Sequence, residues 1–382
     1  MTGSPTTDDV AERMRRVENG VILEPFLRSR PPDTRPLAER MALFDVPGVS
    51  IAVINNYEIE WARGYGVREA GGSESVTEHT LFQACSISKP ITALAVMRLV
   101  QEGRLNLDED VNEYLLSWKV PANNAWQPKV TLRQLLSHTA GTTVHGFPGY
   151  RRDRQVPGLR QVLDGEPPAN TPAIRVNAVP GTQFRYSGGG TSIVQQLLMD
   201  VTRMPFPQLM RELVLEPLGM EDSTYEQPLP EARWSDAATG HRTGGELVAG
   251  KWHIYPEMAA AGLWTTPSDL ARAALELQRV RAGRTGKLVT RETVDQMLTA
   301  QAGGPVGIGF WPDGKGETLR FGHGGDNEGF KCELTAYAEH GLGAAVMTNG
   351  DMGWLLCQEV MAGIAREYRW PLAPDQHQGF LY

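Results

Sequence analysis

The sequence predicts an α/β (α+β) fold, in which one antiparallel sheet is flanked by helices and interrupted by an inserted, mostly helical domain. Apolar residues alternate with the period of a strand at residues 49–61 and again in short runs between residues 318 and 348. The chain between about residues 105 and 225 is mainly helical and rich in connecting loops. Strands near both ends, with helices between them, favour one sheet that both ends share.

The expected domains follow from this order of elements. Residues 1–103 and 250–382 would together form the sheet domain, and residues 104–249 would form the inserted, mainly helical domain. A chain of 382 residues is long enough for two domains, or for one elaborated domain with a substantial core.

The single elements are assigned from apolar periodicity and from residues that start or stop a helix. Val10, Met14 and Val17 are spaced four and three apart, which predicts an amphipathic helix, and Asn55-Asn56 offers a turn between two alternating runs. The helices expected on such grounds lie at residues 9–18, 36–43, 91–102, 131–136, 191–202, 206–218, 267–278 and 353–368. The late strands are expected at residues 318–321, 330–337 and 343–348, and a long irregular segment at residues 142–184.

The helix expected at residues 91–102 differs from the others because it is apolar almost all round. Pro90 falls in its first turn, where a missing N–H costs little, and Gly103 suits the position after its end. A helix with apolar residues on every side is expected to be buried at the centre of the molecule.

Composition excludes several classes of protein. The formal net charge of −8 and the lack of a basic patch make nucleic acid an unsuitable partner. No run of about 20 apolar residues predicts a membrane helix, and residues 1–9 lack the basic and apolar regions of a secretory signal. Three cysteines, Cys85, Cys332 and Cys357, do not make a disulfide framework. The cytoplasm is therefore the predicted location, and Cys85 is expected to be a small buried packing residue.

The usual cofactor and metal signatures are missing from the sequence. It contains no Gly-x-Ser-x-Gly elbow, no phosphate-binding loop, no His-Glu-x-x-His, no Cys-x-x-Cys and no dinucleotide-binding glycine motif. We therefore expect no cofactor and no metal.

Ser86 and Lys89 stand three residues apart at the start of the buried helix. Residues with this spacing lie on one face of a helix, so the hydroxyl and the amine can meet. A serine next to a lysine can be a nucleophile with its own base. Alone, the pair also fits a capped helix start with a solvated lysine.

Two later motifs change that interpretation. Tyr186-Ser187-Gly188 opens a glycine-rich stretch, and His323-Gly324-Gly325 lies on or beside a predicted strand. With Ser86-x-x-Lys89 before them, they resemble the ordered motifs of the β-lactamase-related serine hydrolases, which have a β-lactamase/transpeptidase-like fold. That group includes class C β-lactamases, penicillin-binding-protein-like D,D-peptidases and family VIII esterases. Further agreeing segments are residues 135–141, 216–220 and 262–266.

The resemblance implies a role for each motif residue. Ser86 would attack a carbonyl and form an acyl-enzyme, and Lys89 would be the base if a buried site lowers its pKa. Tyr186 would support Lys89 as a phenolate or as a proton relay, and which residue starts the reaction stays open. The backbone N–H groups of Ser86 and Asp326 would form the oxyanion hole. The active site would lie at the junction of the two domains.

Two departures from the family pattern bear on the substrate. His323 stands where the lactamases have a lysine, and a histidine that is neutral binds a substrate carboxylate weakly. As a catalytic residue, His323 is expected instead to hydrogen bond to Tyr186 or to the leaving group. Gly188 stands where the family has an asparagine that contacts a substrate amide. Gly324 and Gly325 would let a substrate lie close against the strand. Both departures favour an esterase with at most weak β-lactamase activity.

By the same resemblance, Trp252 and Tyr255 would line the acyl pocket, although they also fit a surface loop with packed aromatic rings. Residues 143–150, with His145 and Phe147, would form a wall or lid. For His138 and His145 we favour structural hydrogen bonding. Four further histidines are expected to be ordinary surface or loop residues, namely His79, His241, His340 and His377.

The predicted substrate is therefore a small-molecule ester or amide. The alternatives are a D-amino-acid peptidase or amidase, an acyltransferase on the same fold, or a non-catalytic penicillin-binding-like sensor. The sequence leaves the oligomeric state open.

Overall fold

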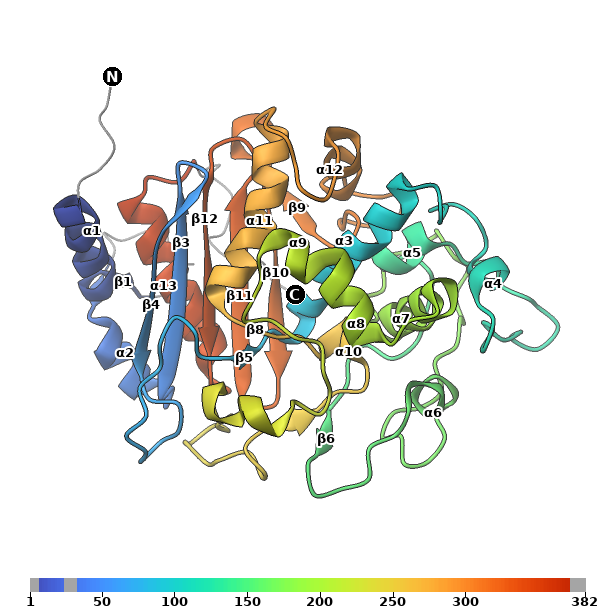
Figure 1. The fold of residues 1–382 in the computed structure, drawn as a ribbon, viewed down its shortest axis with the longest axis horizontal. Coiled ribbons are helices and arrows are strands. Elements are labelled where there is room, and N and C mark those ends of the chain that lie inside the picture. Colours follow the sequence, from blue (N-terminus) through green and yellow to red (C-terminus); the bar gives the residue numbers. More distant parts are fainter. Residues whose placement is uncertain (1–6, 24–32, 372–382) are drawn as a thin grey trace.

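The computed structural model describes residues 7–23 and 33–371. Its central feature is a six-stranded sheet in the order β4-β3-β12-β11-β10-β9, in which every neighbouring pair is antiparallel (Figure 1). The strands are β3 (Gly48–Asn55), β4 (Glu58–Gly66), β9 (Trp311–Asp313), β10 (Arg320–Asn327), β11 (Phe330–Tyr337) and β12 (Leu342–Thr348). The expected fold class is confirmed, and β3 and β12 join the early and late parts of the chain inside one sheet.

Smaller ladders and the helices complete the fold. The short strands are β1 (Val21–Ile22), β2 (Thr34–Arg35), β5 (Phe82–Gln83), β6 (Tyr150–Arg151), β7 (His253–Ile254) and β8 (Trp264–Thr265), which pair as β1-β2, β5-β8 and β6-β7. The helices outside the central part are α1 (Thr7–Asn19), α2 (Leu37–Leu43), α3 (Ser88–Gln101), α10 (Met258–Ala261), α11 (Pro267–Arg281), α12 (Arg291–Met297) and α13 (Gly353–Glu367). Short 3₁₀ turns are η1 (Cys85–Ile87), η3 (Glu231–Asp236) and η4 (Gly316–Thr318).

Helices cover both faces of the sheet. One face carries Val49, Ile51 and Val53, which belong to one apolar core together with residues of α1, α2 and α13. The alternate side chains Ala52 and Ile54 belong to the second core, together with residues of α3 and α11. This alternation is the strand period predicted from residues 49–61. The expected hairpin is present, but it turns one residue later than Asn55-Asn56, at Asn56 and Tyr57, which have positive φ angles.

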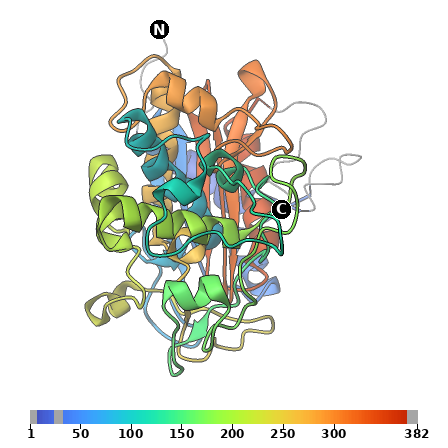
Figure 2. The ribbon, with the colours of Figure 1, turned by 90° about the vertical axis from the view of Figure 1, so that its right-hand side faces the viewer.

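The central part of the chain is mainly helical and lies beside the sheet, as the teal and green segments of Figure 1 show. Figure 2 looks onto this helical part, with strands of the sheet behind it. Its helices are α4 (Val111–Tyr114), α5 (Leu132–Leu136), α6 (Leu159–Asp164), α7 (Gly188–Thr202), α8 (Phe206–Met210) and α9 (Glu216–Leu218). The π-helical turn η2 (Arg211–Leu215) joins α8 to α9, so the helix expected at residues 206–218 changes its winding within that range.

The expected domain boundaries stay a prediction, but the chain returns to the sheet before residue 250. Ala237 bridges to Leu81, and the N–H of His241 donates to the carbonyl of Asn349. The expectation that His241 is a surface or loop residue is wrong in one respect, because its side chain is fully buried. Its ring nitrogens contact the backbone of Asn349 and Ala70, which explains why a polar ring is tolerated there. His377 lies outside the described residues.

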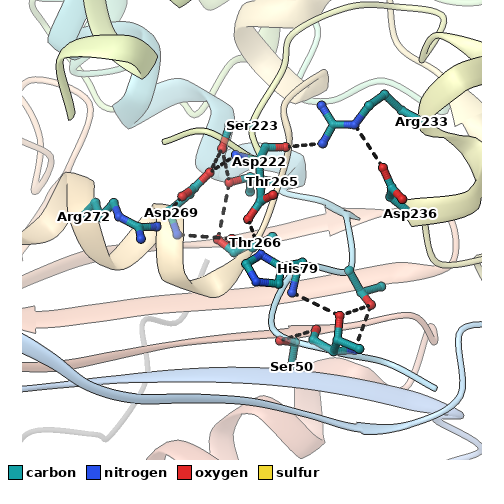
Figure 3. Close-up of polar contacts among 12 residues, drawn as sticks. Ser50, His79, Asp222, Ser223, Arg233, Asp236, Thr265, Thr266, Asp269 and Arg272 are labelled. Carbon is teal, nitrogen blue, oxygen red and sulfur yellow. Dashed lines mark hydrogen bonds and ion pairs between the residues drawn. The ribbon is translucent and has the colours of Figure 1, made fainter. Parts of the chain in front are cut away.

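A polar network ties the start of α11 to the segment before β5 (Figure 3). Asp269 accepts hydrogen bonds from the Ser223 hydroxyl and the Asp222 N–H and pairs with Arg272. The side chain of Asp222 lies 2.9 Å from Nδ1 of the exposed His79. The paired Asp222 raises the pKa of His79, while partial burial opposes this shift. These contacts give His79 a structural partner at the surface.

Three cysteines are buried and unpaired with one another, as expected for Cys85. Within residues 7–23 and 33–371, no helix has the length and apolar character needed to cross a membrane.

Glu257, the residue before α10, is a buried carboxyl group. Its side chain is fully buried, which raises its pKa from an ordinary 4.5 to about 8, while the Tyr150 hydroxyl opposes this shift. Between these two values the folded state holds a proton that the unfolded state has lost. Stability therefore falls as pH rises from about 4.5 to about 8 and is lowest above that window.

We predict that Glu257→Gln removes this pH-dependent loss of folding stability, because the amide carries no charge at any of these pH values. The measured quantity is the melting temperature of Glu257→Gln minus that of the wild type. This difference is expected to be several degrees larger at pH 9 than at pH 5. Thermal unfolding at both pH values measures this. Glu246→Gln, at an exposed carboxylate, is the matched control and is expected to show no such difference. An equal shift at both pH values would contradict the prediction.

Candidate active site

The turn that carries Ser86 is fixed from several sides. Cys85, just before it, has a φ of 53°, and its carbonyl accepts a 2.6 Å hydrogen bond from the Ser88 hydroxyl. The same hydroxyl accepts from the N–H of Leu263 at 3.0 Å. Ser86 itself is only partly buried, whereas the residues on both sides of it are buried. The fold therefore presents one accessible hydroxyl on a rigid turn at the start of α3.

Lys89 lies next to this hydroxyl, as the three-residue spacing predicts. Its Nζ atom is 2.9 Å from Oγ of Ser86 and 2.9 Å from the carbonyl oxygen of Ala260 in α10. The lysine is 4% exposed, and this burial lowers its pKa from 10.5 to about 7. With this pKa, about half of the Lys89 side chains are uncharged at pH 7, and the uncharged amine can accept a proton.

Tyr186 reaches the same point from the segment before α7. Its hydroxyl hydrogen bonds to the Ser86 side chain, and its ring centre lies 5.0 Å from Nζ of Lys89. Burial raises the pKa of Tyr186 well above its ordinary value, and the bond to Ser86 opposes this only in part. The phenol therefore keeps its proton at neutral pH.

Two histidines hold the Tyr186 ring from the helical part. The ring centre of His138 lies 4.3 Å from that of Tyr186, and the ring centre of His145 lies 4.9 Å from it. Nδ1 of His138 accepts from the N–H of Ser187 at 3.2 Å, which agrees with the structural role favoured for His138. Burial, followed by the charge of nearby Lys89, lowers the pKa of His138 well below 6.5. A neutral ring at this position adds no charge beside Lys89.

His323 lies on β10 with its ring centre 6.2 Å from that of Tyr186. Burial, followed by the charge of Lys89, lowers its pKa to about 3, although a contact with the Gly324 carbonyl opposes the shift. Nδ1 lies 2.6 Å from that carbonyl oxygen and therefore carries the ring proton. This assigns Nε2 as the nitrogen that can accept a hydrogen bond. His323 is thus a neutral residue at pH 7, as the substitution for lysine suggested.

β10 runs directly past the turn that carries Ser86. A Cβ atom at Gly325 would lie 2.5 Å from the carbonyl oxygen of Ala84 and 2.9 Å from Cβ of Cys85. Glycine at position 325 is therefore required by packing against the protein itself. β9 pairs only with residues 320–322 of β10, so it does not cover the edge that continues through Gly324.

The turn after Gly325 is anchored by a buried lysine. Nζ of Lys331 lies 2.9 Å from Asp326, 2.9 Å from Asp351 and 3.1 Å from the carbonyl oxygen of Asn327. The side chain of Asp326 is exposed, and its pairing with Lys331 helps to hold the backbone beside η1. The pairing of the Asp326 and Ser86 N–H groups as an oxyanion hole stays a prediction.

The remaining predicted substrate residues do not all lie in an open pocket beside Ser86. Trp252 is 1% exposed, with its ring centre 5.2 Å from that of Trp264 and with Arg152 over its face, so it belongs to the core rather than to an open pocket. Tyr255 is also buried, and its hydroxyl accepts from the N–H of Glu328. Gly188 contacts Phe147 of the segment at residues 143–150.

Trp311 and Lys331 are site residues that the sequence patterns do not identify. The ring centre of Trp311 lies 6.5 Å from those of both Tyr186 and His323, so Trp311 adjoins the candidate site. The strand β9 that carries Trp311 has only three residues, too few to show a period. Among the residues that the structure describes, no group of three or more His, Cys, Asp or Glu side chains could hold a metal ion.

Solved structures with the same fold include an amidase and a penicillin-binding protein homologue. A D-amino acid amidase from Ochrobactrum anthropi SV3 superposes with a TM-score of 0.69 at 19% identity, covering 94% of this chain and 98% of the amidase. An octameric penicillin-binding protein homologue from Pyrococcus abyssi gives a TM-score of 0.67 at 24% identity, covering 87% and 78%. At these identities the likeness concerns the fold alone.

Curated relatives match part of the chain. Protein flp of Staphylococcus aureus (strain MW2) is 27% identical over 235 residues, which are 60% of this chain and 44% of that protein. Esterase EstB of Burkholderia gladioli is 29% identical over 213 residues, 52% of this chain and 54% of the esterase. The matches thus span about half the length of these relatives. Residues 36–354 match the family described as Beta-lactamase, and the chain therefore belongs to this family of serine hydrolases.

Proposed function

We propose that the protein is an esterase that cleaves esters of small, uncharged acids through an acyl-enzyme on Ser86. The observation that carries the proposal is the contact between Lys89 and Ser86, 2.9 Å long, with a pKa of about 7 on the buried lysine. A serine hydroxyl needs such a base, because it is a weak nucleophile at its own pKa.

In the first step, Lys89 accepts the proton of the Ser86 hydroxyl while Oγ attacks the ester carbonyl. The carbonyl oxygen becomes an oxyanion, for which the N–H groups of Ser86 and Asp326 are the proposed donors. The intermediate then breaks its bond to the alcohol oxygen, which takes up a proton. The protonated Tyr186 hydroxyl, bonded to Ser86, is suited to pass that proton from Lys89 to the leaving alcohol. This supports the proton-relay role over the phenolate.

In the second step, water takes the place of the alcohol. The same base removes a proton from the water as it attacks the acyl carbonyl, and the bond to Oγ of Ser86 breaks. Oγ recovers its proton from Lys89, and the free acid leaves. Neutral Nε2 of His323, beside Tyr186, can accept a hydrogen bond from this water or from the leaving alcohol.

Two features support an ester over a β-lactam or a peptide. His323 is neutral at pH 7, so it supplies no positive charge for a substrate carboxylate. Gly188 supplies no side chain to bond a substrate amide. The relationship to an esterase, EstB, agrees with this choice. The D-amino-acid amidase or peptidase, the acyltransferase and the non-catalytic sensor are the alternatives that the following experiment separates.

We predict that Ser86→Ala lowers kcat for p-nitrophenyl acetate by at least about 10⁴-fold, because no other group can form the acyl-enzyme. Intact mass spectrometry with a fluorophosphonate is expected to show one adduct on the wild type and none on the variant. Ser235→Ala, at an exposed serine, is the control and is expected to keep both activity and adduct.

Each alternative has its own result in this experiment. Full turnover by Ser86→Ala would refute the nucleophile. Faster cleavage of D-aminoacyl amides than of esters would favour the amidase, and faster transfer to an added amine or alcohol than to water would favour the acyltransferase. A wild-type protein without adduct or turnover would favour the sensor.

We also predict that kcat/KM for this ester falls as pH is lowered through about 7, because Lys89 becomes protonated and can no longer accept the Ser86 proton. The limb should have a slope near one in a plot of log kcat/KM against pH. His323, with a pKa of about 3, adds no second limb above pH 5. Lys89→Arg stays charged at every pH and is expected to lose about 10²–10⁴-fold in kcat. A flat profile from pH 5 to 9 would rule out Lys89 as the base.

A further inference from the structure

The segment of residues 142–147 is docked onto the start of α7. The Ser187 hydroxyl donates to the carbonyl of Thr143 at 2.7 Å, and the N–H of Gly188 donates to that of His145 at 2.9 Å. The N–H of Gly189 donates to the carbonyl of Val144 at 3.0 Å. These bonds hold the segment in one position, as a fixed wall rather than a free loop.

The glycines at the start of α7 are needed because of this docking. A Cβ atom at position 189 would lie 2.6 Å from the carbonyl oxygen of Thr143, and one at position 190 would lie 2.9 Å from Oγ1 of Thr142. A Cβ atom at Gly188 would lie 2.9 Å from Cε2 of Phe147 and 3.2 Å from the carbonyl oxygen of His145. The phenyl ring therefore occupies the space that a side chain at position 188 would enter.

That space adjoins the catalytic group. Only Ser187, whose backbone is extended with φ −150° and ψ 113°, separates Gly188 from Tyr186. Tyr186 points to Ser86, and the ring of His145, from the docked segment, lies 4.9 Å from the Tyr186 ring. Phe147 is only partly buried, so part of its ring remains available for contact.

We propose that Phe147 determines substrate specificity by replacing a polar contact to the acyl chain with an apolar one. The protein would then take esters of short aliphatic or aryl acids and discriminate against acyl chains that contain an amide. The reason is that an amide placed against a phenyl ring gives up its hydrogen bonds to water without replacing them. This inference rests on the proposed esterase function and specifies its substrate class.

The test compares two esters with acyl chains of equal length. p-Nitrophenyl pentanoate has an apolar chain, and p-nitrophenyl N-acetylglycinate has an amide in the same position. The measured quantity is the ratio of kcat/KM for pentanoate to that for acetylglycinate, compared between variants so that the intrinsic reactivity of each ester cancels. The variants are Phe147→Ala, Gly188→Asn and the double variant. Gly158→Ala is the control, since this exposed glycine lies outside the segment and a Cβ there meets only the end of the Gln161 side chain, at 3.9 Å.

Phe147→Ala is expected to lower the ratio about tenfold by losing apolar contact with pentanoate. Gly188→Asn alone is expected to lose at least about tenfold on both esters, because its side chain clashes with Phe147. The double variant has room for the asparagine and is expected to lower the ratio about 10–100-fold relative to the wild type. Its kcat/KM for acetylglycinate is expected to be higher than that of Phe147→Ala. Gly158→Ala is expected to leave the ratio unchanged.

Melting curves identify variants that do not fold. If the variants that carry Gly188→Asn do not fold, the ratio measured for Phe147→Ala alone tests the proposal. Suppose that the wild type reacts with a fluorophosphonate and cleaves the pentanoate ester. If the ratio is then unchanged in Phe147→Ala and in any folded double variant, the specificity role of Phe147 alone is overturned. A wild type that does neither would overturn it together with the proposed function.

Discussion

The burial of Lys89 is the physical constraint on which the site depends. An ammonium group removed from water loses its hydration, so its pKa falls and the neutral amine becomes available beside Ser86. Burial requires apolar surroundings, and α3 supplies them because it is apolar on nearly every side. The carbonyl of Ala260 in α10 then fixes the amine with one hydrogen bond. The same helix is thus the centre of the core and the support of the chemistry.

His138, His323 and Tyr186 lie near Lys89, and none of the three adds a positive charge beside it at pH 7. His138 and His323 are both neutral rings near the lysine, and each has its pKa lowered first by burial and then by the charge of Lys89. Tyr186 stays a neutral phenol. A buried lysine with neutral rings around it suits the proposed reaction of uncharged substrates. A permanent cation on β10 would add attraction for an anion but would also lower the pKa of Lys89 further.

Packing against the protein itself explains why glycine stands at positions 188 and 325 near the site. Gly325 allows β10 to approach the turn before Ser86, and Gly188 allows the segment with Phe147 to dock on α7. In the sequence alone both are interpreted as substrate contacts, and a glycine at a close approach fits that interpretation equally well. The neighbouring atoms supply a packing reason for both glycines, and several of these atoms come from chain segments far away in the sequence. The buried Trp252 illustrates the same point, since an aromatic residue before α10 fits a pocket or a core equally well.

The sequence by itself determined the fold class, the hairpin at residues 49–61, the buried helix and the pairing of Ser86 with Lys89, because each depends on local period or spacing. It also determined the order of the three motifs and hence the family. Only the tertiary structure decided the pKa of Lys89, the neutrality of His323, the anchoring of Asp326 by Lys331 and the place of Phe147 beside Gly188. Desolvation and steric exclusion depend on atoms that the fold brings together, and no local pattern records them.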